Sequence, residues 1–207
     1  MARSGSAAAP TPVWLEVGAR WVFAGAVDWP GWCRRGRGEE GALEALAAYA
    51  PRYAVVAESG FAPGALRVVG RVGGDATTDF GAPGRPGPWD DVPMDAAEAE
   101  RQAALLAAAW RAFDAAAAAS PPVLRKGPRG GGRDRDAIVD HVRDAERAYG
   151  RKVGVRVPAR TPWADQRTAL LHAARDGASG AWTARYFLRR TAWHVLDHAW
   201  EIEDRRS

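Results

Sequence analysis

The segment from Thr183 to Glu203 has the sequence TARYFLRRTAWHVLDHAWEIE, and its apolar residues recur with the spacing of an α-helix. At about 100° per residue, one ridge of this helix carries Phe187, Thr191, His194, His198 and Glu201. An aromatic stripe (Tyr186, Trp193, Trp200) flanks the ridge on one side, and an aliphatic stripe (Leu188, Val195, Ala199, Ile202) flanks it on the other. We therefore expect both histidines to point into a protein interior.

Three further helices are predicted before this one, over residues 95–119, 135–151 and 163–176. Asp95 and Thr183 are start signals, the pair Thr161–Pro162 is another, and Gly177 is a stop signal. Four long helices in succession are typical of a helical bundle. Residues 94–207 are therefore predicted to form a four-helix bundle.

The first part of the chain has the composition of a small sheet domain. Strands are predicted over residues 13–17, 21–27, 53–57 and 66–72, and a helix over residues 39–50. This order predicts an α+β domain spanning residues 13–74, preceded by a flexible arm of residues 1–12. Residues 75–93 are rich in Pro and Gly and are predicted to be a linker or a draped loop. The whole chain is expected to be α+β.

Composition narrows the range of functions. The 207 residues are 47% hydrophobic and 26% charged, which excludes wholesale disorder. The N-terminus has no apolar core of a signal peptide, and no apolar run is long enough to span a bilayer. We therefore expect a cytoplasmic protein without a membrane partner. The single Cys33 excludes an internal disulfide and a cysteine-cluster metal site, and this side chain is expected to be a half-buried bystander.

The charge pattern gives little support to nucleic acid as a partner. The net charge is +4, and the basic stretches are short: Arg34, Arg35 and Arg37 are expected in a turn, and residues 125–135 in a Gly-rich loop. Only two of the 29 basic residues are lysines, and together with the many Ala and Gly residues this indicates a GC-rich genome. Nucleic-acid binding is the weakest of the functional alternatives.

The histidines predict a metal site. His194 and His198 lie one helical turn apart, a spacing with which one helix supplies two ligands to a metal. His141 lies beside the expected buried stripe of the helix 135–151, so it can supply a third ligand from a facing helix. His172 leans away from the core side of its own helix and is not expected to join. Three histidine ligands suit a divalent transition metal such as Zn, Ni or Fe.

Two acidic residues lie near this ridge. Glu201 is a candidate catalytic residue, as a fourth ligand, an acceptor for a ligand's N–H or a proton shuttle, and a solvated glutamate is an equal alternative. Asp197 lies about 60° from the ridge, and we expect it to orient a neighbour or to pair with Arg190. Three histidines alone would leave coordination positions for a water or a thiolate.

Two stretches resemble the DinB-like superfamily: DAIVDHVRDAE, residues 136–146, and YFLRRTAWHVLDH, residues 186–198. The resemblance covers roughly residues 94–204. It implies a four-helix bundle with a histidine triad made of His141, His194 and His198. It also implies a metal-dependent S-transferase or isomerase that uses a low-molecular-weight thiol such as mycothiol or bacillithiol. The GC-rich character suits a mycothiol-using actinobacterium.

The N-terminal part is similar to a HicB-like antitoxin fold. The similarity lies in DWPGWC at residues 28–33 and GRGEEGAL at residues 36–43, and it covers residues 13–60. These sequence features are therefore consistent with two functions. One is a metal-dependent transferase or hydrolase acting on a small-molecule substrate. The other is a non-catalytic metal-binding or regulatory protein with an antitoxin-type interaction module. A homodimer is left open.

Overall fold

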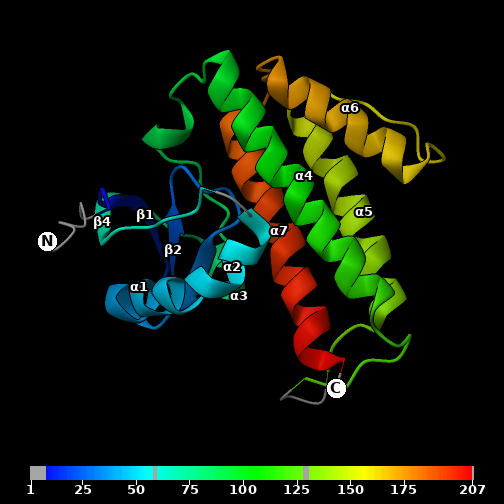
Figure 1. Cartoon of the computed structure of the whole chain (residues 1–207), viewed down its shortest axis with the longest axis horizontal. Coiled ribbons are helices and arrows are strands. Elements are labelled where there is room, and N and C mark those ends of the chain that lie inside the picture. The colour runs from blue at the N-terminus through cyan, green and yellow to red at the C-terminus, as the bar shows by residue number, and fades with distance from the viewer. Residues whose placement is uncertain (1–7, 58–59, 128–130, 207) are drawn as a thin grey trace, which may run out of the picture. The chain divides into compact units, whose positions relative to one another are not determined.

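The computed structural model describes residues 8–57, 60–127 and 131–206. The chain divides into two compact units, Met1–Trp89 and Asp90–Ser207. The first holds a mixed β-sheet with helices, and the second is built from long helices (Figure 1). The predicted α+β class is therefore confirmed.

The first unit contains a four-stranded sheet in the order β3-β2-β1-β4. Its strands are Thr11–Val17 (β1), Val22–Ala26 (β2), Cys33–Gly36 (β3) and Leu66–Gly73 (β4). The pairs β1–β2 and β2–β3 are antiparallel, whereas β4 runs parallel to β1. Two helices, Gly38–Ala48 (α1) and Ala50–Ala57 (α2), connect β3 to β4, and α1 packs against β2 and β3.

Aromatic residues organise the core of this unit. The Trp32 indole donates to the carbonyl of Leu46 at 2.9 Å, which ties the turn after β2 to α1. The Trp14 ring lies against Gly25 on the neighbouring strand, where a Cβ atom would come within 2.2 Å of it. Only glycine at this position lets the large indole lie flat on the sheet.

Two predictions for this unit are wrong. Residues 53–57 form the second half of α2 and not a strand: Tyr53 and Val56 are buried while Val55 is 80% exposed, a helical and not an alternating pattern. The Tyr53 hydroxyl donates to the Pro30 carbonyl at 2.9 Å and holds this face inward. Arg34 and Arg35, expected to lie in a turn, belong to β3 at the edge of the sheet.

Residues 75–93, expected to be a linker or a draped loop, contain ordered structure. A short helix, Ala76–Phe80 (α3), begins with a capping box between Asp75 and Thr78, and a 3-10 turn, Pro88–Asp90 (η1), follows. The buried Glu16 of β1 accepts backbone N–H groups of Gly84 and Arg85 at 2.9 and 3.0 Å. The first part of this segment is therefore bound to the sheet of its own unit.

The second unit contains the four long helices that the sequence predicts, Ala96–Ala118 (α4), Arg135–Lys152 (α5), Trp163–Arg175 (α6) and Ala184–Arg205 (α7). Their bounds differ from the predicted ones by two residues at most. The Asp95 and Thr183 side chains cap α4 and α7 by accepting from backbone N–H groups. The helix α7 packs against each of α4, α5 and α6, and Figure 1 shows it running behind α4.

The helix α7 is the centre of the second unit. Most of its residues are buried, including the ridge residues Phe187, Thr191 and His194. Within the described part of the chain, none of the helices is long and apolar enough to cross a membrane.

Candidate metal centre

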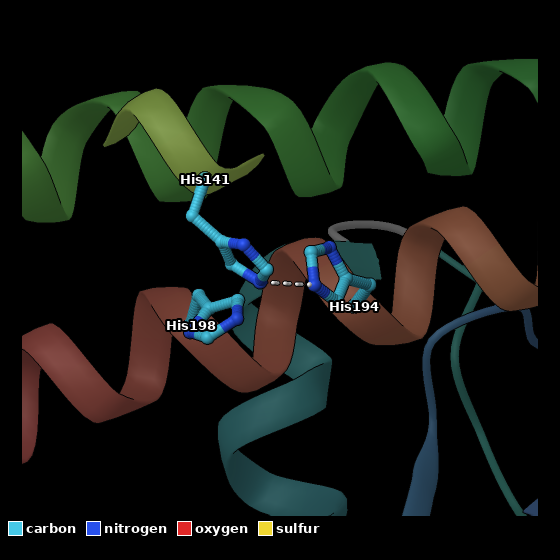
Figure 2. Close-up of side chains that lie close together, drawn as sticks. All are labelled: His141, His194 and His198. Carbon is cyan, nitrogen blue, oxygen red and sulfur yellow. Dashed lines mark hydrogen bonds between the residues drawn. The ribbon is translucent and has the colours of Figure 1, made fainter. Parts of the chain in front are cut away.

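The three predicted histidines come together between α5 and α7. His141 projects from α5 towards His194 and His198 on α7, as Figure 2 shows. One ring nitrogen of each lies within 4.8 Å of the others. The Nε2 atoms of His141 and His194 are 3.1 Å apart. The convergence expected from the sequence is therefore observed.

Helix geometry places these side chains. His194 and His198 are four residues apart on α7, so their imidazoles lie on one face of the helix and meet edge to face, with ring centroids 4.7 Å apart. On α5, the fully buried Ile138 and Val142 fix the side that packs inward. His141 lies next to this stripe, and the packing of α5 on α7 brings its ring to 5.0 Å from each of the other two.

The geometry of the cluster fits a transition metal. Bonds of about 2.0–2.1 Å to one ion require ligand nitrogens roughly 2.9–3.4 Å apart, for octahedral to tetrahedral angles. The 3.1 Å separation of the His141 and His194 nitrogens already meets this requirement. The 4.8 Å limit for the whole set means that side-chain adjustments of roughly 1–2 Å would bring all three to one ion.

The protonation of the cluster favours a cation. Burial lowers the pKa of His194 well below its ordinary value, and the charges of His198 and Arg190 act in the same direction. Burial, followed by the charges of His198 and Arg133, lowers the pKa of His141 as well. Two of the imidazoles are therefore neutral near pH 7 and offer lone pairs, the form that coordinates a metal.

Glu201 completes the surroundings of His198. A Glu201 carboxylate oxygen lies 2.8 Å from His198 Nδ1, and the other accepts from Arg205. Burial raises the pKa of Glu201, but the hydrogen bond with His198 and the nearby Arg205 bring it below its ordinary value on balance. An ionised Glu201 accepts the Nδ1–H of His198 and leaves the Nε2 lone pair free. This geometry favours the acceptor role for Glu201 over that of a fourth ligand.

The other candidates are placed differently. His172 is exposed on α6 and takes no part in the cluster. Cys33, expected to be half-buried, is buried in the first unit. Asp197 does not form the expected pair with Arg190, whose guanidinium lies over the rings of Tyr149 and Trp193. The environment of Arg190 was not found from the sequence, because the spacing to Asp197 on the same helix offered it an ion pair.

The basic stretches considered for nucleic-acid binding have partners within their own units. Arg34 lies 3.9 Å from the Tyr49 ring centroid, and Arg35 and Arg37 lie over Trp21 at 5.1 and 4.4 Å. In the loop after α4, Arg125 donates to the Asp204 carbonyl. Residues 128–130 of this loop lie outside the described residues. These contacts give the arginines local structural roles.

Comparison of the chain with protein-family models, with curated proteins and with solved structures finds no match. The function of the three-histidine cluster therefore has to be argued from the residues of the chain itself.

Proposed function

We propose that His141, His194 and His198 bind a divalent transition metal, Zn, Ni or Fe, and form the catalytic centre of a transferase or hydrolase that acts on a small molecule. One observation carries this proposal: three histidine nitrogens converge within 4.8 Å, and the described residues supply no fourth side chain to the group. Structural metal sites are commonly closed by four protein ligands, whereas catalytic sites keep a position open.

Glu201 has a positioning role in this proposal. Both of its carboxylate oxygens are engaged, one by His198 and one by Arg205, so neither is free to close the site. Its negative charge holds the proton of His198 on Nδ1 and keeps the Nε2 lone pair directed away. A metal at this position supplies Lewis acidity that lowers the pKa of a water or a thiol near it.

The burial of the three histidines is graded. His194 is 7% exposed, while His141 and His198 are partly exposed. A small molecule therefore approaches from the side of His141 and His198, and His194 forms the deep end. A site that is deep on one side limits access by water and strengthens electrostatic interactions within it.

We propose a low-molecular-weight thiol, mycothiol in the first place, as the co-substrate. The resemblance of residues 94–204 to DinB-like proteins supports this. The positive charges near the cluster support it too. Those of Arg190 and Arg133 lower the pKa of His194, and positive charge at this place favours a thiolate over a neutral ligand. If no thiol binds, hydrolysis with water as the nucleophile is the remaining activity of the same centre.

The first experiment is metal analysis of protein purified without a histidine tag. We expect about one equivalent of metal, because the three histidine nitrogens converge on one site. His141→Ala is expected to lose it, because this removes the only ligand from α5. His172→Ala, which removes an exposed histidine outside the cluster, is the matched control and is expected to retain the metal. Metal-free wild-type protein, or metal retained by His141→Ala, would contradict the proposal.

The second experiment separates catalysis from a purely structural metal. Cobalt(II) replaces the native metal, and its visible absorption is recorded while mycothiol is added. A thiolate that enters an open position changes the spectrum, whereas a closed site does not respond. If the spectrum stays unchanged with mycothiol, with cysteine and with small ligands that replace metal-bound water, the alternative is favoured: a non-catalytic metal-binding or regulatory protein.

A further inference from the structure

Arg190 is a buried cation without an anionic partner. Its side chain lies on α7 and is 8% exposed. Among the residues that the structure describes, it forms no ion pair, and its Nη1 has no hydrogen-bond partner. Its contacts are with π faces: the guanidinium carbon lies 5.1 Å from the Tyr149 ring centroid and 4.6 Å from that of Trp193.

The other buried arginines of α7 are paired. Arg185 binds the Glu98 carboxylate with two nitrogens, and Arg189 binds Asp90 in the same way. Burying a charge without a counter-charge is costly, and a cation–π contact offsets only part of that cost. Arg190 therefore retains N–H donors that a ligand can satisfy.

Arg190 lies next to the histidine cluster. It precedes His194 by four residues on α7, which is roughly 6 Å along the helix axis. The two rings that contact its guanidinium also contact His194, with centroid separations of 5.6 Å for Tyr149 and 6.2 Å for Trp193. The guanidinium of Arg190 and the ring of His194 thus share Tyr149 and Trp193 as neighbours, and the charge of Arg190 acts on His194, so one small molecule can reach both.

We propose that Arg190 binds a carboxylate of the small molecule that the three-histidine centre takes as ligand. This inference rests on the function proposed above. A guanidinium presents paired N–H donors that match the two oxygens of a carboxylate. A carboxylate monoanion also neutralises the single charge of Arg190.

The charges of the site point in the same direction. Three neutral imidazoles around a divalent ion leave a charge of +2, and Arg190 adds +1. Glu201 is the carboxylate in hydrogen-bond contact with the cluster, and it is shared with Arg205. A ligand with a thiolate at the metal and a carboxylate at Arg190 balances two of these charges. Mycothiol has no free carboxylate, so with mycothiol at the metal the carboxylate belongs to a second molecule, the acceptor substrate; with another thiol it belongs to the thiol itself.

The test compares two small thiols on the zinc-loaded protein by calorimetric titration. Mercaptoacetate and 2-mercaptoethanol both offer a thiol on a two-carbon chain, but only mercaptoacetate carries a carboxylate. We expect mercaptoacetate to bind roughly 10- to 100-fold more tightly, the range of a charge-assisted hydrogen-bonded pair. Arg190→Met is expected to abolish this preference, because mercaptoacetate loses the paired N–H donors, whereas 2-mercaptoethanol loses only the effect of a nearby positive charge and should weaken much less. Equal binding by the wild type, or a preference that survives in Arg190→Met, would overturn the inference.

Arg133→Met is the matched control. Arg133 is exposed, and its charge also acts on His141 and His194, so removing it changes the field without removing the buried guanidinium. It is expected to retain most of the preference. An equal loss in Arg133→Met and Arg190→Met would mean that general electrostatics act and would overturn direct recognition. Arg190→Lys keeps the positive charge but lacks the paired N–H donors of the guanidinium, and it is measured in case Arg190→Met does not fold. Its preference for mercaptoacetate should fall well below that of the wild type.

Acetate distinguishes the two sources of the carboxylate. Acetate that binds with 2-mercaptoethanol already on the zinc indicates a separate carboxylate substrate. Acetate that binds only in the absence of 2-mercaptoethanol, and binds the wild type but not Arg190→Met, indicates that thiol and carboxylate belong to one molecule. Acetate that binds both proteins equally well is held by the zinc and overturns the inference. If the protein takes up no zinc, the proposed function fails, and Arg190 is then tested alone. Acetate should raise the melting temperature of the metal-free wild type above a matched chloride control, but not that of Arg190→Met, and the absence of this difference overturns the inference.

Discussion

Buried polar side chains have opposite surroundings in two regions of α7. In the paired region, Arg185 and Arg189, each arginine binds a carboxylate through two nitrogens. In the open region, Arg190 to Glu201, Arg190 is as deeply buried but has no ion pair within the described chain, and His194 Nδ1 has no hydrogen-bond partner there. Because an unpaired buried polar group is destabilising, we infer that the paired region stabilises the helix while the open region is completed by ligands.

The largest effect is expected when an ion pair of the paired region is removed. Asp90 is 1% exposed, and Asp90→Asn leaves the buried Arg189 without a counter-charge. We expect the free energy of unfolding to fall by about 3–5 kcal/mol, the range for removing one partner of a buried ion pair. Urea titration followed by circular dichroism measures it. The metal content of the folded fraction should stay unchanged, and a loss of metal would show that the two regions are not independent.

The second effect concerns the metal in the open region. A metal that binds only the folded protein stabilises it by about 4 kcal/mol when its free concentration is 1,000 times the Kd. Adding zinc to chelator-treated protein should therefore raise the melting temperature. His194→Ala should remove this increase but remain folded without metal, because Leu188, Val195 and Leu196 still pack α7. His172→Ala should respond to zinc as the wild type does. A zinc response that survives in His194→Ala would contradict the proposed site.

Glu201 gives an intermediate effect. Replacing the acceptor of a ligand histidine's N–H typically weakens metal binding 10- to 100-fold. Glu201→Gln is therefore expected to raise the zinc Kd by about this factor, measured by competition with a chromophoric chelator. Glu203→Gln, on the same helix but outside the ridge, is the control and should leave the Kd within about twofold, since metal ligation is short-range. A larger loss than for His198→Ala would instead indicate direct ligation by Glu201.

The long helices could be predicted because several local signals agree. On α7, the ridge, the two apolar stripes and the Thr183 cap all favour one helix, and the structure has it over Ala184–Arg205. The convergence of His141 with His194 and His198 followed from the same periodicity. In the first unit, the residues 53–57 have the composition of a strand, but tertiary contacts of Tyr53 hold them in a helix.

The remaining differences come from contacts that a sequence pattern does not encode. β3 has two consecutive arginines, which suggest a turn, but charged residues are also typical of an edge strand. Arg190 lies seven residues, two helical turns, from Asp197, a spacing that predicts an ion pair. The structure instead places its guanidinium over Tyr149 and Trp193, and ring contacts between helices depend on packing that periodicity leaves open.

The metal-free open region should also be sensitive to pH. The pKa of His194 is well below its ordinary value of about 6.5, and that of His141 is lowered too. Below about pH 6.5, His141 and His194 therefore bind protons in the unfolded chain but not in the folded protein. The free energy of unfolding falls as the pH decreases from about 6.5 towards the pKa values of these groups in the folded protein. Above this range, His141 and His194 contribute nothing to the pH dependence of the free energy of unfolding. We expect a smaller decrease in His194→Ala, measured by urea titration between pH 7.5 and 5, roughly the range in which histidine titrates. Equal decreases in both proteins would assign the dependence to other groups.

The smallest effect tests whether pairing alone distinguishes the two regions. Arg175 on α6 binds Glu100 on α4 through two nitrogens, a geometry like that of Arg189 and Asp90. Here the side chains are 34% and 60% exposed, so water screens the pair and leaves little cost when one partner is lost. The lowered pKa of Glu100 arises from its hydrogen bond with Arg175, in a group that stays hydrated. We therefore expect Arg175→Gln to lower the free energy of unfolding by less than about 1 kcal/mol, several times less than Asp90→Asn. Comparable losses in the two variants would mean that burial does not set the contribution of these pairs, and the contrast between the paired and the open region would then lose its physical basis.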